Sequence, residues 1–365
     1  MKFSCEASEL KKALNIALKA ITGKASTPIM SGVYLLAEGE KLIVRGSDLN
    51  ISIETNIPVT VEDAGAVLVN GKFITELIGK IEGKVEVFDD GQELLVKSVG
   101  NNIYHIVKMN ANDYPEFPKL EVQNKLTLDE KVFSEMVYMT EFACATEDAR
   151  PLFTGILMEI KDGKLTFVGT NTHRLAIKSV AMEGEELSCV IPARVLNEIR
   201  NIVSGLSESL PVEIGLLYNQ VMISVGETKL ITRLLDGRFP DYRRVIPQNF
   251  NLSATMNRVD LIKVLDRVVI FSKQNDHSTV KLNFADGKVQ VNASGIDIGN
   301  ALEEVDCEMQ GDALKIAFNA GYIMEVLRHT DAEKITFKLN TSLTPGLLDI
   351  GDTDFIYIIT PVRVV

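Results

Sequence analysis

The same order of helix and strand signals occurs three times along the 365-residue chain. Each copy opens with an amphipathic helix signal, which begins at Ser8, Val132 and Val259. Two strand-like runs follow, and a further strand then leads into a second, shorter helix. Equivalent points lie roughly 120 residues apart, which is the length of a domain rather than of a solenoid repeat. The sequence therefore predicts three similar domains, an arrangement that favours a ring or an arc over an enzyme with one pocket.

The strand signals within each copy are short and alternate between polar and apolar residues. Residues 51–55, 84–88 and 334–339 are examples, and this period of two is typical of a sheet with one solvated face. Asp-Gly turn signals separate such runs at residues 90–91 and 162–163. We therefore predict an α+β fold in which each domain has two helices and about eight antiparallel strands.

Proline-rich, polar stretches separate the three copies. They lie at residues 115–118 and 240–247 and have the composition of inter-domain linkers. We therefore place the three domains at residues 1–119, 126–247 and 248–365.

Composition indicates a folded protein inside the cell. Hydrophobic residues make up 46% of the chain and charged residues 24%, which suits a solvated protein with an ample core. No apolar run approaches the roughly 18 residues that a membrane span needs. The first residues also lack the apolar run and cleavage site of a signal peptide. We therefore expect a cytoplasmic protein with no membrane partner.

Neither the cysteines nor the histidines are grouped for chemistry. The four residues of each type are scattered, without a CxxC pair or metal-ligand spacing, and we expect the cysteines to be small buried hydrophobic residues. The glycine-rich, Walker, HExxH and GxSxG patterns of common catalytic sites are also missing from the sequence. The sequence therefore predicts no catalytic residue, no metal site and no cofactor.

Basic residues concentrate in the predicted helices although the net charge is −12. They are Lys11, Lys12, Lys19, Lys72, Lys80, Arg194, Arg200, Lys263, Arg267, Lys273 and Arg328, and Lys24 lies in the loop that follows the first helix. A basic helical face on an acidic body would attract a phosphate backbone without reading its sequence. The alternative is that these residues are only the solvated side of surface helices. The first helix of the second copy does not share the bias, because Glu130, Glu135 and Glu141 outnumber Lys131 there.

Several segments resemble those of one known family. They are residues 1–3, 27–29, 46–49, 172–176 and the run DGRFPDYRRVIP at residues 236–247. The last run is long and unusual in composition, so chance is a poor explanation for it. Over essentially its full length the chain resembles the bacterial sliding clamp, the beta subunit of the replicative DNA polymerase.

This resemblance implies three copies of one α+β domain, closed head to tail as a dimeric ring of six domains with the helices inside. It implies a non-catalytic processivity factor that encircles double-stranded DNA. Sliding requires electrostatic, water-mediated contacts without base readout. The implied DNA contact of the first copy is Lys24, and Lys72 and Arg194 on second helices are further candidates.

The resemblance also implies an assembly and its partners. The homodimer would join Tyr104 and Ile106, on an edge strand, to Ile270 and Phe271 at the end of a helix. We expect these apolar side chains to be exposed in a single chain. The protein partners would be the polymerase alpha subunit, the clamp loader delta subunit, translesion polymerases, mismatch repair proteins and ligase. The protein would act in the cytoplasm, at replication forks on the nucleoid.

A short hydrophobic peptide from each partner would dock between the second and third copies. The matching positions are Phe153, Thr170, Thr172, His173, Arg174, Leu175, Pro240, Arg244, Val245, Asn319, Tyr322, Leu343, Pro361, Val362 and Arg363. Apolar walls suit leucine or phenylalanine, and the polar members would orient the peptide. Leu175 and Val245 would also pack between domains. Pro345, Thr360 and Val362 depart from the family's pattern, so we expect a preferred peptide that differs in detail.

Two alternatives compete with this interpretation. An enzyme could use His173 as a base beside Asp236 or Asp241, but no nucleophile, oxyanion donor or metal ligand accompanies it. A three-domain scaffold could instead bind proteins alone. Retention on circular but not on linear DNA distinguishes the clamp from the scaffold, because only a closed ring is held by topology.

Overall fold

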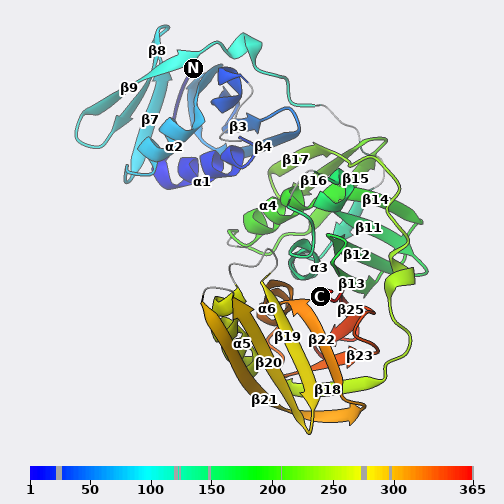
Figure 1. Ribbon diagram of the computed structural model, residues 1–365. Helices are drawn as coiled ribbons and strands as arrows, with labels where there is room; N and C mark the ends of the chain where they lie inside the picture. Colours follow the sequence, from blue (N-terminus) through cyan, green and yellow to red (C-terminus); the bar gives the residue numbers. More distant parts are fainter. Residues whose placement is uncertain are drawn as a thin grey trace. The chain divides into compact units, whose positions relative to one another are not determined.

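The computed structural model describes residues 1–21, 27–118, 122, 125–146, 149–206, 208–272, 278–295 and 298–363 (Figure 1). The chain forms two compact units. The first contains Met1–Ser134 and Val195–Leu234, and the second contains Glu135–Arg194 and Leu235–Val365. The second copy of the repeat therefore contributes to both units.

The first unit is built on a 13-stranded sheet with the order β10-β15-β16-β17-β4-β3-β2-β6-β9-β8-β7-β1-β5. Its strands are β1 (Lys2–Glu6), β2 (Gly32–Glu38), β3 (Lys41–Ser47), β4 (Ile51–Pro58), β5 (Thr60–Asp63), β6 (Gly65–Asn70), β7 (Lys84–Asp89), β8 (Glu93–Ser98), β9 (Asn102–Met109), β10 (Lys125–Leu128), β15 (Val212–Leu217), β16 (Gln220–Val225) and β17 (Thr228–Arg233). The first and second copies join where β4 pairs antiparallel with β17, opposite residues being Ser52 and Ile231.

The second unit is built on a 12-stranded sheet with the order β14-β11-β12-β13-β25-β24-β23-β18-β21-β20-β19-β22. Its strands are β11 (Gly155–Lys161), β12 (Lys164–Thr170), β13 (Arg174–Ala181), β14 (Leu187–Pro192), β18 (Leu252–Asn257), β19 (Thr279–Ala285), β20 (Lys288–Gly295), β21 (Gly299–Gly311), β22 (Leu314–Asn319), β23 (Lys334–Leu339), β24 (Gly346–Asp349) and β25 (Phe355–Ile359). The second and third copies join where β13 pairs antiparallel with β25, opposite residues being Arg174 and Ile359.

Two helices accompany each copy, as the sequence predicts. They are α1 (Ala7–Leu18), α2 (Gly71–Ile78), α3 (Glu130–Glu141), α4 (Ala193–Val203), α5 (Arg258–Val268) and α6 (Ala320–Arg328), with short 3-10 helices η1 (Pro28–Ser31), η2 (Ala111–Asp113), η3 (Pro151–Thr154), η4 (Tyr242–Val245) and η5 (Val269–Ser272). In the first unit α1 and α2 lie side by side, and α1 packs on β3 and β4 (Figure 1). The apolar face of α1, which includes Leu10 and Leu14, is buried in the core of that unit.

A glycine marks an equivalent close contact in each copy. Gly46 in β3, Gly169 in β12 and Gly295 in β20 lie against backbone at the end of the first helical segment of their copy. A Cβ at Gly46 would lie 2.1 Å from the backbone oxygen of Ala17, and one at Gly169 would lie 2.1 Å from that of Thr140. Backbone cannot move aside as a flexible side chain can, so only glycine fits. The repeat in the sequence is thus also a repeat of tertiary contacts.

The predicted α+β repeat is confirmed, with nine strands described in the first copy and eight in each of the others. The cysteine prediction holds in part. Cys5 and Cys144 are buried, whereas Cys189 and Cys307 are only half-buried. Burial raises the pKa of the Cys144 thiol to about 12, which keeps it protonated and unreactive.

The described residues contain neither a membrane-spanning helix nor a metal-binding group. No helix among them is long and apolar enough to cross a membrane. The same residues contain no group of three or more His, Cys, Asp or Glu side chains placed to hold a metal ion.

Candidate peptide-binding site

A cavity of about 280 Å³ lies in the second unit, between residues of the second and third copies of the repeat. Its lining residues are Phe153, Thr170, Thr172, Arg174, Leu175, Phe239, Pro240, Asp241, Tyr242, Val245, Pro345, Ile358 and Thr360. The β13–β25 pairing holds the two copies together at this site because it places Leu175 directly opposite Ile358.

The turn between β12 and β13 forms one rim of the cavity. The side-chain oxygen of Asn171 accepts hydrogen bonds from the backbone N–H groups of His173 and Arg174, at 3.0 and 3.1 Å. The Thr170 hydroxyl donates to the carbonyl oxygen of Arg174 at 2.6 Å. Thr172 has a φ of 78°, a conformation that a non-glycine residue adopts only when its surroundings enforce it. These short-range bonds fix the rim without a contribution from any ligand.

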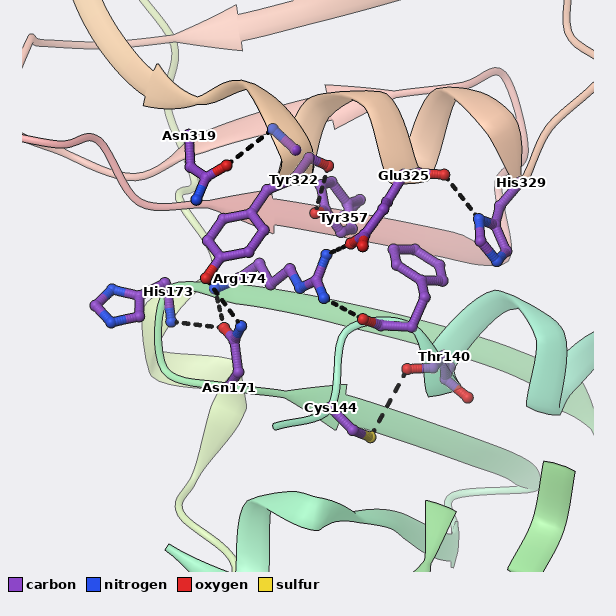
Figure 2. Close-up of polar contacts among 12 residues, drawn as sticks. Thr140, Cys144, Asn171, His173, Arg174, Asn319, Tyr322, Glu325, His329 and Tyr357 are labelled. Atoms are coloured by element: carbon purple, nitrogen blue, oxygen red, sulfur yellow. Dashed lines mark hydrogen bonds and ion pairs between the residues drawn. The ribbon is translucent and has the colours of Figure 1, made fainter. Parts of the chain in front are cut away.

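Arg174 joins the second copy to the third beneath this rim (Figure 2). Its side chain is 7% exposed, and its guanidinium pairs with Glu325 of α6 and donates to the carbonyl oxygen of Phe142. The guanidinium carbon lies 4.4 Å from the centre of the Tyr322 ring, a cation–π geometry. The Tyr322 hydroxyl in turn accepts a hydrogen bond from Asn171 at 3.2 Å. Contacts within the protein therefore already hold the Arg174 side chain in place.

The floor of the cavity is apolar. Leu175, Tyr242 and Ile358 are buried members of one hydrophobic cluster. Phe153 and Phe239 meet edge to face, with ring centres 5.9 Å apart. Such a floor accepts aliphatic and aromatic side chains by removing their surface from water.

The residues around η4 are held in place by β11. The Tyr242 hydroxyl donates to the carboxylate of Glu159 at 3.2 Å, and Arg243 pairs with the same carboxylate. Burial, with a smaller effect of Glu159, raises the pKa of Tyr242 to about 12, so the hydroxyl remains a donor at neutral pH. The run that contains η4 was predicted to include a linker, and it also packs as part of this wall.

The structure brings together about half of the predicted pocket residues. Phe153, Thr170, Thr172, Arg174, Leu175, Pro240 and Val245 line the cavity. Leu343, Val362 and Arg363 line a neighbouring groove, and Arg244 lines a third hollow beside η4.

The remaining four predicted positions line none of these three cavities. Asn319 caps α6 by accepting from the N–H of Gly321 at 2.8 Å. Tyr322 lies under Arg174, His173 is exposed and Pro361 is half-buried.

The sequence prediction missed several lining residues. They are Phe239, Asp241, Tyr242 and Ile358, whereas Pro345 and Thr360 were expected there as departures from the family's pattern. Phe239, Asp241 and Tyr242 belong to the run DGRFPDYRRVIP, so that run contained a signal for them. Ile358 reaches the site only through the pairing of β25 with β13, which no local pattern reveals.

The candidate DNA contacts are only partly described. Lys24 lies outside the described residues, whereas Lys72 in α2 and Arg194 in α4 are exposed. Several cations of the helices have nearby carboxylates, as when Lys19, the C-cap residue of α1, pairs with Glu198 of α4 at 2.7 Å. The basic bias of the helices is thus partly neutralised within the protein.

The expected dimer residues differ in exposure. Ile270 is exposed and Phe271 half-buried against the core, but Ile106 is only 3% exposed and Tyr104 is half-buried. The expectation that all four are exposed is therefore wrong, because Ile106 points into the core of the first unit. The exposed apolar residues of β9 are Ile103 and Val107, on the opposite face of the strand.

Comparisons with known proteins identify the family. Models of the N-terminal, central and C-terminal domains of the DNA polymerase III beta subunit match residues 1–118, 127–241 and 243–363. The chain belongs to the DNA polymerase III beta subunit family. It is therefore of the class of sliding clamps, non-catalytic processivity subunits whose partners are DNA and a polymerase.

Similarity to individual relatives extends over the whole chain. The beta sliding clamp of Staphylococcus aureus (strain Mu50) is 29% identical over 376 aligned positions, which cover 100% of this chain and 99% of the relative. Among solved structures, the sliding clamp of Bacillus subtilis matches with a TM-score of 0.93 at 25% identity. The DNA polymerase III beta chain of Streptococcus pneumoniae matches with a TM-score of 0.94 at 29% identity. Both matches cover 100% of each chain.

Proposed function

We propose that two copies of this chain close head to tail into a six-domain ring around duplex DNA, and that the cavity captures a hydrophobic peptide from each partner. The cavity is the observation that carries this proposal, because apolar walls from two copies of the repeat suit leucine and phenylalanine side chains. The peptides would come from the polymerase alpha subunit, the clamp loader delta subunit, translesion polymerases, mismatch repair proteins and ligase. The ring would act in the cytoplasm, at replication forks on the nucleoid.

A peptide titration tests the pocket. Val245 is half-exposed at the cavity, so Val245→Asp should place a charge where a leucine would enter. The affinity for a fluorescent Gln-Leu-x-Leu-Phe peptide, measured by anisotropy, should fall by about 30-fold. Val259→Asp in α5 is the matched control, because that valine has a similar exposure and lines none of the three cavities described above. Equal affinities of wild type and Val245→Asp would exclude this cavity as the peptide site.

The two ends of the proposed ring interface are unpaired strand edges in the described structure. Residues 102–107 of β9 pair only with β8, since β6 reaches only Lys108 and Met109. Residues 299–306 of β21 pair only with β20, since β18 begins its pairing at Cys307. Such edges are open to another strand. A contact between β9 of one chain and β21 of the next would continue the sheets and cover exposed Val107 and Leu302.

Topological retention tests the encirclement of DNA. Lys24, Lys72 and Arg194 are the candidate phosphate contacts within the proposed hole. The chain, loaded onto a nicked circular plasmid by its clamp loader, should co-elute with the DNA at high salt and be released when the plasmid is linearised. Release at the same rate from circular and linear DNA would support a scaffold that binds proteins alone.

A further inference from the structure

A groove of about 920 Å³ lies on the third copy, next to the proposed peptide pocket. Its lining residues are Lys281, Leu282, Asn283, Gln290, Asn292, Leu302, Lys315, Ile316, Ala317, Ser342, Leu343, Val362 and Arg363. Strand register brings the polar members together, because Asn283 lies opposite both Gln290 of β20 and Lys315 of β22. The groove therefore follows the solvent-facing side of β19, β20 and β22.

The charge of this groove is opposite to that of the whole protein. Lys281, Lys315 and Arg363 line it, and no carboxylate does. Among the described residues none of these three cations forms an ion pair. Some other cations of the same sheet are matched, as by the Lys288–Glu304 pair at 2.9 Å. A local cationic site in a chain of net charge −12 would attract an acidic ligand.

The last described residues connect the groove to the pocket. The backbone N–H of Thr360, a pocket residue, donates to the carbonyl oxygen of His173 at 2.9 Å. Two residues later, the N–H of Val362 donates to the carbonyl oxygen of Ala317 at 2.8 Å, and both Val362 and Ala317 line the groove. These two hydrogen bonds hold residues 360–362 along one continuous path from the pocket to the face of β22.

We infer that the groove binds the residues that flank the hydrophobic peptide of a partner, and that it selects flanks rich in Asp and Glu. The inference rests on the proposed function of the neighbouring pocket. Lys281, Lys315 and Arg363 attract the acidic side chains, while exposed Leu343 gives the flank apolar surface to lie on. This leucine favours a peptide over a phosphate backbone, which would gain nothing from it. Exposed lysines act as screened point charges, so the preference should weaken with salt.

The test uses the full-length chain and Gln-Leu-x-Leu-Phe peptides that carry three Ser, three Glu or three Lys residues at either end. For one of the two ends, Glu flanks should strengthen binding to the wild type by about tenfold over Ser flanks at low salt. The double variant Lys281→Glu/Lys315→Glu should lose this gain and should prefer Lys flanks. Its matched control, Lys161→Glu/Lys164→Glu, makes the same change of charge at the exposed β11–β12 turn and should keep the wild-type preference.

The possible results distinguish the groove from the pocket. No gain from Glu flanks at either end, or an equal loss of gain in both double variants, would overturn the inference while leaving the pocket intact. A short duplex DNA whose binding is lost only in Lys281→Glu/Lys315→Glu would reassign the groove to nucleic acid. Failure of the Ser-flanked peptides to bind the wild type would overturn the pocket itself, and the inference would fall with it.

Discussion

Arg174 shows how one side chain can line a site and also hold the fold together. The sequence placed it among the peptide-orienting residues because it follows His173 in a segment that resembles the family's pocket. The structure adds its contacts with Glu325 and Tyr322 of α6 and with Phe142, the residue that follows α3. Glu325 and Tyr322 lie far along the chain, and no local pattern marks Phe142. The sequence could therefore predict that Arg174 belongs to the site, but not which residues its side chain contacts.

Replacing Arg174 should lower the stability of the protein more than replacing an exposed arginine does. Arg174→Ala leaves the half-exposed Glu325 without its cation and removes the stacking on Tyr322, so it should lower the free energy of unfolding by about 2 kcal/mol. Arg244→Ala is the control, because Arg244 is 83% exposed and, among the described residues, pairs only with Asp241, three residues earlier. That variant should change stability by less than about 0.5 kcal/mol. Chemical unfolding measures both, and equal effects would contradict the structural role of Arg174.

Asp349 predicts an acid dependence of stability. Burial works to raise its pKa, but the hydrogen bond from Lys338 and the N–H of Gly351 outweigh it and lower the pKa below its usual value. A carboxylate with a lowered folded-state pKa stabilises the protein above its unfolded pKa of about 3.9 and loses that contribution as the pH falls further. Asp349→Asn should therefore be less stable than wild type at pH 6, with the difference shrinking towards pH 3. Unfolding curves at both pH values check this, and a difference that stays constant would contradict it.

At the scale of elements, the sequence predicts the local order of helices and strands well, but it does not predict which distant strands pair. Helices and strands repeat in the order that the sequence indicates, because amphipathic period and Asp-Gly turns are local signals. The pairings of β4 with β17 and of β13 with β25 join different copies across more than 170 residues of chain. No periodicity records such a pairing, so the predicted domains gave no hint that two sheets run from one copy into the next. The domain limits at residues 119, 126, 247 and 248 remain predictions.

The repeated glycine contact gives a test at this scale. Gly169→Ala would place a Cβ 2.1 Å from the carbonyl oxygen of Thr140, which forces α3 away from β12. The free energy of unfolding should fall by about 3 kcal/mol. Gly184→Ala is the control, because its Cβ would meet only the Ile160 side chain at 3.7 Å. The control should be neutral or slightly stabilising, and equal losses in chemical unfolding would show that the close contact is not responsible.

For the whole molecule, the proposed assembly depends on strand edges that a single chain leaves open. Val107 is 77% exposed on the stretch of β9 that pairs with β8 but leaves its other edge open. Val107→Glu should therefore convert the proposed dimer to a folded monomer. Val99→Glu is the matched control, because Val99 is 70% exposed in the turn that joins β8 to β9. Sedimentation of the two variants decides the matter. A Val107→Glu variant that still sediments as a dimer would place the interface elsewhere.

The division of the second copy between two compact units also bears on how the chain is made. The first copy emerges from the ribosome long before β17 has been synthesised. Strand β4 therefore has no partner until the chain has grown past residue 228. In the same way, β13 must wait for β25, which begins at residue 355. The middle copy can thus finish folding only when nearly the entire chain has emerged. Premature termination before residue 355 should leave a β13 edge that invites aggregation and rapid proteolysis.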